Sequence, residues 1–262
     1  MHPALWISKT GLDAAQTDVA TISNNLANAS TVGFKKGRAI FEDLLYQNIN
    51  QPGGRSSADT ELPSGLMLGA GSKVVATQKE FSQGNLLTTD NALDMSIQGR
   101  GFFEILMPDG SLAYTRNGQF TLDDQGQIVT PGAGSPLQPN IAIPEDAQQI
   151  TISQDGQISA TVRGQAEPVV LGQLTLSDFI NPTGLQPVGQ NLYVETATSG
   201  APLQGVPGLQ GLGSIMQGAL ETSNVNVTEE LVNLIESQRL YEMNSKVISS
   251  VDQMLGQVIQ QL

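Results

Sequence analysis

The chain contains no cysteine, and this absence excludes disulfide bonds, thiolate metal sites and cysteine nucleophiles. Basic residues are also few, because 12 lysines and arginines face 25 aspartates and glutamates, for a formal net charge of −13. So acidic a chain argues against nucleic acid as a partner, since the phosphate backbone requires a basic surface. It also disfavours binding to an anionic membrane.

Long hydrophobic runs are missing as well. No segment approaches the roughly 18 apolar residues of a membrane span, so we expect no direct membrane insertion. The N-terminus has no basic stretch followed by an apolar one, because residues 2–18 are amphipathic and polar within every turn. We therefore expect no cleaved signal peptide, which leaves a cytosolic protein or one exported by another route.

Patterns typical of catalysis or metal binding are scarce. The only histidine, His2, would have to serve any Ser-His-Asp triad. Residues 98–103 contain a G-x-G but lack the third glycine and the helix of a dinucleotide fingerprint. Residues 123–126 lack the later acidic ligands of a calcium loop, and Glu229 and Glu230 are acids expected in a first helical turn. We predict a protein that is not an enzyme, with no catalytic, cofactor-binding or metal site and no cofactor.

The most regular pattern that is present covers Ala4 to Phe34. Apolar residues recur there at spacings of three, four and seven, the seam of a helix that packs against another helix. The seam consists of Leu5, Leu12, Ala15, Val19, Ile22, Leu26 and Ala29. Turn-forming residues at positions 28–33 predict the end of this helix.

A second helical pattern covers residues 226–262. Thr228 or Asn226 is the expected N-cap, and two acids follow in the first turn. Its stripe is interrupted by polar residues at 238, 244 and 245 and consists of Leu231, Leu234, Tyr241, Ile248, Val251, Leu255, Val258 and Leu262. Because a seam lies near each end with little other core around it, we expect burial between molecules.

Strand and turn signals dominate the middle of the chain. Short apolar runs separated by Asp-Gly and Asn-Gly dipeptides predict an antiparallel sandwich or barrel over residues 91–198. Residues 74–81 alternate as a strand, whereas residues 35–48 fit either a helix or an extended segment. The Gly-, Ser- and Pro-rich residues 50–71 fit a disordered loop or an extended arm that neighbouring subunits order.

We therefore expect an α+β fold with long terminal helices in a coiled-coil-like layer, a central antiparallel β-rich domain and an extended arm. The expected domains are a helix at 1–34, an arm region at 35–90, a β domain at 91–198, a Gly/Pro-rich connector at 199–225 and a helix at 226–262.

Polar residues interrupt both helical seams. Three asparagines crowd the end of the first helix, where they either fray it or bond across a helix–helix interface and fix its register. The predicted subunit-interface residues are Leu5, Leu12, Val19, Ile22, Asn24, Asn25, Leu26, Asn28, Leu231, Leu234, Gln238, Tyr241, Asn244, Ile248, Val251, Leu255, Val258 and Leu262.

Four stretches carry the signature of a known family. They are Thr21-Ile-Ser-Asn-Asn-Leu-Ala-Asn28 with Thr31-Val-Gly-Phe-Lys35, Leu231-Val-Asn-Leu-Ile235 with Gln238-Arg239, Tyr241-Glu242 and Asn244-Ser-Lys-Val-Ile248, Gly99-Arg-Gly-Phe-Phe103, and Tyr114-Thr-Arg-Asn-Gly-Gln-Phe120. The chain resembles bacterial flagellar rod and hook proteins at both ends and in the β region, so the resemblance covers most of its length.

This resemblance implies a structural subunit that the flagellar type III apparatus exports unfolded and that assembles into a hollow helical tube in the periplasm. The terminal helices would form the inner layers of the tube and the β domain the outer layer. The tube would transmit motor torque to the hook and conduct exported subunits. Implied partners are further copies of the chain, the hook protein, proximal rod proteins, the surrounding basal-body ring proteins and the export apparatus.

Length and the Gly/Ser-rich segment favour a distal rod subunit within this family. A proximal rod or hook-type axial protein is the alternative, and a secreted β module that trimerises through terminal coiled coils is a more distant one. We expect an arm that contacts adjacent subunits and stiffens the tube, through Gly53, Gly54, Ser56, Ser57, Pro63 and Gly65.

Overall fold

The structure is a computed structural model that describes residues 3–50, 55–57, 60–61, 64–163 and 167–260. The chain forms two compact units, each made of segments that are distant in sequence. We call Met1–Ala27, Gly37–Lys79 and Asn226–Leu262 the helical unit, and Asn28–Lys36 and Glu80–Val225 the β unit. Among the predicted site residues, Gly53, Gly54, Pro63 and Leu262 lie outside the described residues.

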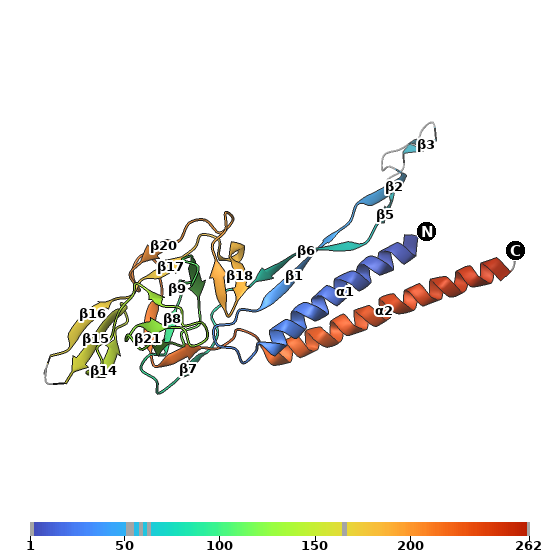
Figure 1. Ribbon diagram of the computed structural model, residues 1–262. Coiled ribbons are helices and arrows are strands. Elements are labelled where there is room, and N and C mark those ends of the chain that lie inside the picture. The colour runs from blue at the N-terminus through green and yellow to red at the C-terminus, as the bar shows by residue number, and fades with distance from the viewer. Residues whose placement is uncertain (1–2, 51–54, 58–59, 62–63, 164–166, 261–262) are drawn as a thin grey trace. The chain divides into compact units, whose positions relative to one another are not determined.

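The helical unit contains two long helices, α1 (Pro3–Ala27) and α2 (Val227–Gln260), which lie side by side and run in opposite directions (Figure 1). The apolar periodicity near the two ends of the sequence therefore predicted both helices correctly. The first helix is shorter than the expected segment, because it ends at Ala27 and residues 28–33 form turns and a bend. Asn226 is the N-cap of α2, since its Oδ1 accepts a hydrogen bond from the Thr228 N–H at 3.1 Å.

A long antiparallel hairpin completes the helical unit (Figure 1). Its paired strands are β1 (Gly37–Asp43) with β6 (Ser72–Lys79), β2 (Tyr46–Asn50) with β5 (Leu66–Gly69), and β3 (Arg55–Ser57) with β4 (Thr60–Glu61). Helix α1 packs against β1 and β6. Residues 35–48, which fitted either a helix or a strand, are thus largely extended, and β6 confirms the strand expected at 74–81.

The β unit consists of antiparallel strands in small sheets. The largest sheet has the strand order β13-β9-β10-β19-β18, and a three-stranded sheet has the order β14-β15-β16. Two-stranded pairs β11–β12, β17–β20, β21–β8 and β22–β7 accompany them in the described part of the chain. The elements are β7 (Leu86–Thr88), β8 (Met95–Gln98), β9 (Phe103–Leu106), β10 (Leu112–Thr115), β11 (Thr121–Leu122), β12 (Ile128–Val129), β13 (Leu137–Gln138), β14 (Ala147–Ile152), β15 (Gln157–Val162), β16 (Val169–Gln173), β17 (Leu176–Asp178), the 3₁₀ turn η1 (Pro182–Gly184), β18 (Gln186–Gly189), β19 (Leu192–Val194), β20 (Leu203–Gly205), β21 (Ser214–Gln217) and β22 (Ala219–Glu221).

Residues 199–225 do not form a plain connector, because they contain β20, β21 and β22. These strands pair with β17, β8 and β7, which lie far from them in sequence. The glycines that indicated a connector instead serve turns between short strands: Gly208, Gly211 and Gly218 all have positive φ.

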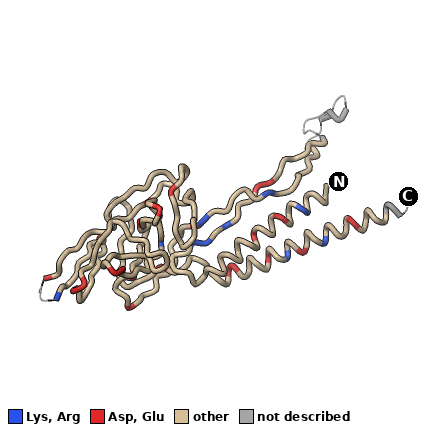
Figure 2. The backbone as a smooth tube through the Cα atoms, in the orientation of Figure 1, with Lys and Arg blue, Asp and Glu red and all other residues tan. Residues whose placement is uncertain are grey.

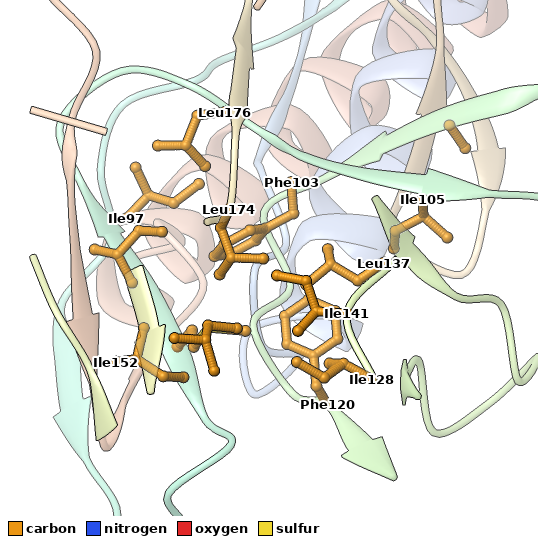
Figure 3. Packing of buried hydrophobic residues seen from close by; sticks show 14 of the residues in the cluster. Ile97, Phe103, Ile105, Phe120, Ile128, Leu137, Ile141, Ile152, Leu174 and Leu176 are labelled. Carbon is orange, nitrogen blue, oxygen red and sulfur yellow. The ribbon is translucent and has the colours of Figure 1, made fainter. Parts of the chain in front are cut away.

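The core of the β unit is built mainly from branched aliphatic residues, as the low aromatic content requires. Side chains from several of its strands and loops converge on one cluster, in which Phe103 and Phe120 meet edge to face at 5.4 Å between ring centroids (Figure 3). A second, aromatic cluster contains Phe102, Tyr114, Phe179, Leu185 and Tyr193. This unit therefore buries a substantial core within one chain.

The buried tyrosines of this second cluster predict a loss of stability at alkaline pH. Burial raises the pKa of both Tyr114 and Tyr193 from 10.0 to about 12. The unfolded chain releases these protons first, so their stabilising contribution is complete below pH 10 and is lost as the pH rises towards about 12, by roughly 3 kcal/mol per tyrosine at most. Absorbance titration at the phenolate band should show both groups ionising near pH 12 in the folded protein. In Tyr114→Phe/Tyr193→Phe the decline in stability over that range should be much smaller; an unchanged decline would contradict the assignment.

Candidate assembly interface

The contact between α1 and α2 is organised by three layers of small or polar residues, which we call the polar layers. In one layer the Asn25 Nδ2 donates a hydrogen bond to Glu230 Oε2 at 3.0 Å. In the next the Ser237 hydroxyl donates to Asp18 Oδ2 at 2.5 Å. In the third, Gly11 lies so close to Asn244 that a Cβ at position 11 would be 2.8 Å from Asn244 Nδ2.

The polar layers repeat every seven residues. Positions 11, 18 and 25 ascend along α1, while positions 244, 237 and 230 descend along α2. A seven-residue step returns to nearly the same face of a helix, so both helices keep one face in contact over two full repeats. The two helices therefore share a single antiparallel register in this chain.

Asn25 is the asparagine of the predicted cluster that bonds across the helix pair. It is 2% exposed, and besides Glu230 it exchanges two hydrogen bonds of 2.8 Å with the backbone of Gly37 at the start of β1. Asn28 instead accepts a hydrogen bond from the Thr31 hydroxyl in the turn after α1, at 3.1 Å. The side chain of Asn24 is exposed.

The apolar part of this seam is thin. Ile22 and Val251, predicted interface residues, are buried, as is Ala15, whereas Leu5, Leu12, Val19, Leu26, Leu234, Asn244 and Ile248 are half-buried. Leu231, Gln238, Tyr241 and Leu255 are exposed, and the side chain of Val258 lies outside the described part of the chain. Among the arm residues, Ser56 and Ser57 belong to β3, and Gly65 is half-buried just before β5.

Much of the apolar surface of α2 remains exposed beside α1. Its exposed large apolar residues are Val227, Leu231, Val232, Ile235, Leu240, Tyr241, Met243, Val247, Met254 and Leu255. Val232, Ile235 and Met243, with Glu236, Arg239 and Leu240, line a shallow groove of about 400 Å³. A helix with apolar side chains beyond its contact face needs further partners, because a soluble surface rarely leaves such a patch uncovered.

Sequence reasoning missed the small and polar members of the seam: Ser8, Gly11, Asp18, Glu230 and Ser237. It considered apolar residues and the asparagines and glutamine that interrupt them, whereas the signal that could have found these five is the seven-residue spacing of other non-apolar positions.

A buried ion cluster lies in the β unit. Lys35 Nζ is 2.6 Å from Glu221 Oε1, and an Arg116 guanidinium nitrogen is 3.4 Å from Glu221 Oε2. All three side chains are at most 5% exposed. Burial lowers the pKa of Lys35, and the neighbouring Glu221 carboxylate opposes this shift.

Further hydrogen bonds complete this cluster. Lys35 Nζ also donates to the Ser82 carbonyl at 2.7 Å, Arg116 donates to the Gly99 carbonyl at 2.7 Å, and the Gly84 N–H donates to Glu221 at 2.9 Å. Three of the stretches that resemble flagellar proteins thus meet here, through Lys35, Gly99 and Arg116. The cluster has the character of a structural clamp, since each charge is paired and enclosed.

The described residues contain neither a candidate metal-binding cluster nor a candidate membrane-spanning helix. They contain no group of three or more His, Asp or Glu residues placed to hold a metal ion. No helix among them is long and apolar enough to cross a membrane.

Comparison with known proteins identifies the family. Three family models match: "Flagella basal body rod protein" at residues 6–35, "Flagellar hook protein FlgE/F/G D1 domain" at residues 96–160, and "Flagellar basal body rod FlgEFG protein C-terminal" at residues 216–261. They cover α1, much of the β unit and α2.

Relatives that match along the full length of the chain belong to the same family as these models. The chain is 55% identical to the flagellar basal-body rod protein FlgG of Buchnera aphidicola from Acyrthosiphon pisum, over 99% of this chain and 100% of the relative. It is 47% identical to FlgG of Borreliella burgdorferi over 98% of this chain and 97% of the relative. It is 36% identical to FlgG of Bacillus subtilis over 99% of this chain and 98% of the relative. The chain therefore belongs to the flagellar basal-body rod protein family and is a structural subunit of the flagellum.

Proposed function

We propose that this chain builds the distal part of the flagellar rod by polymerising into a hollow helical tube, which transmits motor torque to the hook and conducts exported subunits. The observation that carries the proposal is the apolar surface of α2 that its own chain leaves exposed. The similarity to FlgG proteins along the whole chain and the Gly/Ser-rich residues 50–71 support the distal position.

The proposed mechanism is assembly through unlike surfaces. A contact between two different faces of the same subunit does not close on itself, so it propagates into an open filament. Each few hundred Å² of apolar surface buried between subunits contributes several kcal/mol, at about 25 cal/mol per Å². In this arrangement the terminal helices form a coiled-coil-like inner layer and the β unit forms the outer layer.

The remaining parts of the proposal follow from family membership. The chain acts without catalysis or cofactor, in the periplasmic rod, after export that needs no cleaved signal peptide. Its partners are further copies of itself, the hook and proximal rod proteins, the surrounding ring proteins and the export apparatus. Acidic residues outnumber basic ones along α2 (Figure 2), so we expect salt to favour assembly by screening like charges.

The free subunit should have disordered terminal helices. The seam between α1 and α2 buries few apolar side chains and contains the polar layers, so the pair gains little from packing without neighbours. In NMR spectra of the monomer we expect amide signals of residues 5–28 and 230–262 to be poorly dispersed, beside dispersed signals from the β unit. Dispersed, slowly exchanging amides in both helices would contradict this expectation.

The arm should stiffen the polymer. The described part of this segment includes Asn50 and the strands β3, β4 and β5 of the hairpin, and it exposes Leu66, Met67 and Leu68. A subunit without residues 50–71 is expected to build a more flexible or curved rod, measured as a shorter persistence length in electron micrographs. A rod of unchanged straightness would contradict this role and show that residues 50–71 act only as a surface loop.

A further inference from the structure

A pocket of about 400 Å³ lies entirely within the β unit. Four segments line it: the turn after α1 at residues 28–31, the end of β10 at 115–117, the loop after β12 at 130–133, and the turn between β18 and β19 at 190–192. Its volume falls within the range of small-molecule sites, about 300–1,000 Å³. The residues that line it belong neither to the buried ion cluster nor to the polar layers.

Hydrogen bonds within and between these segments hold the pocket in shape. The Thr115 hydroxyl donates to the Asn191 carbonyl at 2.8 Å and accepts from the Asn117 N–H at 3.1 Å. The Asn191 Nδ2 donates to the Val32 carbonyl at 2.8 Å, which ties the turn between β18 and β19 to the segment after α1. Folding of the β unit therefore forms the pocket without the help of a ligand.

The walls of the pocket are polar and uncharged. The described lining residues include no Asp, Glu, Lys or Arg and no aromatic residue. They carry three threonine hydroxyls and four carboxamides, those of Asn28, Asn117, Gln190 and Asn191. An anionic ligand would find no cation here, and a cationic ligand would find no carboxylate. Hydroxyls and carboxamides both donate and accept hydrogen bonds, so they match a neutral ligand whose own groups do the same.

Two of these carboxamides have hydrogen-bonding capacity that the described part of the chain does not use. The Asn117 Oδ1 accepts from the Gln119 N–H at 3.1 Å, but no described residue bonds its Nδ2. Asn191 uses its Nδ2 for Val32, and its Oδ1 receives no bond from the described residues. A donor on one segment and an acceptor on another are thus available to a ligand.

Gln190 gives an independent observation. Its φ of 54° lies in the left-handed region, where glycine or asparagine is usual and a longer side chain is strained. Its carboxamide makes no hydrogen bond to any residue that the structure describes. The fold therefore gives no reason for a glutamine at this position, whereas a ligand in the pocket that its side chain lines does give one.

We propose that this pocket binds a neutral oligosaccharide. Sugar hydroxyls carry no charge and both donate and accept hydrogen bonds, as the threonines and carboxamides of the walls do. The acetamido group of an N-acetylated sugar adds one further donor and acceptor. Binding is expected to be weak, with a dissociation constant of about 1 mM, because the lining offers no aromatic ring to stack on a sugar face.

A peptide fits this pocket less well than a sugar. Proteins bind peptides along strand edges, in apolar grooves, or through clusters of aromatic or charged side chains. Turns and strand ends with uncharged polar side chains line this pocket instead. The inference goes beyond the proposed rod, because one subunit contains the whole pocket and binding does not require a polymer.

NMR titration of the purified full-length chain tests the proposal, at a protein concentration too low for polymerisation. The two probes are N,N′-diacetylchitobiose and cellobiose, and we expect saturable shifts of amide signals from residues 115–117 and 190–192. Such shifts with either sugar support the pocket, and the tighter binding of one of them identifies recognition of acetamido groups or of hydroxyls. Absence of shifts with both sugars, or shifts with the neutral peptide Gly-Ser-Asn-Gly alone, would overturn the proposal.

A pair of matched glutamine variants separates binding from folding. Gln190→Gly should leave the β unit at least as stable in thermal unfolding, because glycine adopts a positive φ without strain, and yet raise the dissociation constant about fivefold or more. Gln210→Gly removes the same side chain at a φ of 55° outside the pocket, so it should change the dissociation constant less than twofold. Equal effects of the two substitutions on binding would overturn the proposal.

A second pair tests the unused donor. Asn117→Asp keeps the acceptor for the Gln119 N–H and removes only the Nδ2 donor, so we expect a loss of affinity of about fivefold or more. Asn85→Asp makes the same change at an exposed position of the β unit outside the pocket and should alter affinity less than twofold. Unchanged affinity of Asn117→Asp, or an equal loss in both variants, would contradict the assigned site.

Discussion

Replacing Glu221 with glutamine is expected to lower the free energy of unfolding of the β unit by about 3–5 kcal/mol, as the loss of one partner of a buried ion pair does. Glu221 is 1% exposed and contacts Lys35 at 2.6 Å and Arg116 at 3.4 Å. Without its charge, two enclosed cations lose their common counter-ion and repel each other. Urea denaturation followed by tyrosine fluorescence, which reports on the buried Tyr114 and Tyr193, measures the effect.

An exposed ion pair of the same unit provides the control. Arg100 contacts Asp178 at 3.0 Å with 66% of the arginine side chain exposed. Arg100→Gln should therefore cost no more than about 1 kcal/mol. If both substitutions shift the urea midpoint equally, the buried cluster is not the clamp that its geometry indicates.

Gly118→Ala should be equally severe for a steric reason. A Cβ at this position would lie 1.5 Å from the backbone oxygen of Met95. The two segments cannot separate freely, because the Met95 N–H donates a hydrogen bond to the Gly118 carbonyl at 3.0 Å and Met95 is fully buried. We expect a loss of about 4 kcal/mol or more, the range of severe core disruption.

Gly132→Ala is the matched comparison, because a Cβ there would meet nothing within 4 Å. It should change the free energy of unfolding by no more than about 0.5 kcal/mol. Thermal unfolding followed by circular dichroism gives both values. A Gly118→Ala protein as stable as Gly132→Ala would mean that the Met95 backbone shifts at little cost.

Local signals predicted the local structure well. Periodicity and capping residues predicted α1, α2 and the Asn226 cap, and alternation predicted β6. Composition was less reliable at residues 199–225, because glycines that indicate a connector equally serve the turns between short paired strands. Turn residues at 28–33 did predict the end of α1, but no local signal indicated that residues 28–36 contribute to the β unit.

The decisive side-chain contacts could not be predicted. Lys35 and Glu221 are separated by 186 positions, and Asn25 and Glu230 by 205. The Lys35–Glu221 pair leaves no periodic signal, because its meeting depends on the path of the whole chain. Asn25 and Asn244 of the polar layers were predicted as interface residues, whereas Gly11, Asp18, Glu230 and Ser237 were missed, because a search for apolar stripes passes over them. The same search did find Val251 and Leu255.

We propose that exposed apolar surface on the terminal helices drives open-ended assembly. Electron microscopy of the purified full-length chain at rising concentration tests it most directly. We expect hollow tubes of constant diameter whose length increases with concentration. A closed oligomer of fixed size at every concentration would contradict it.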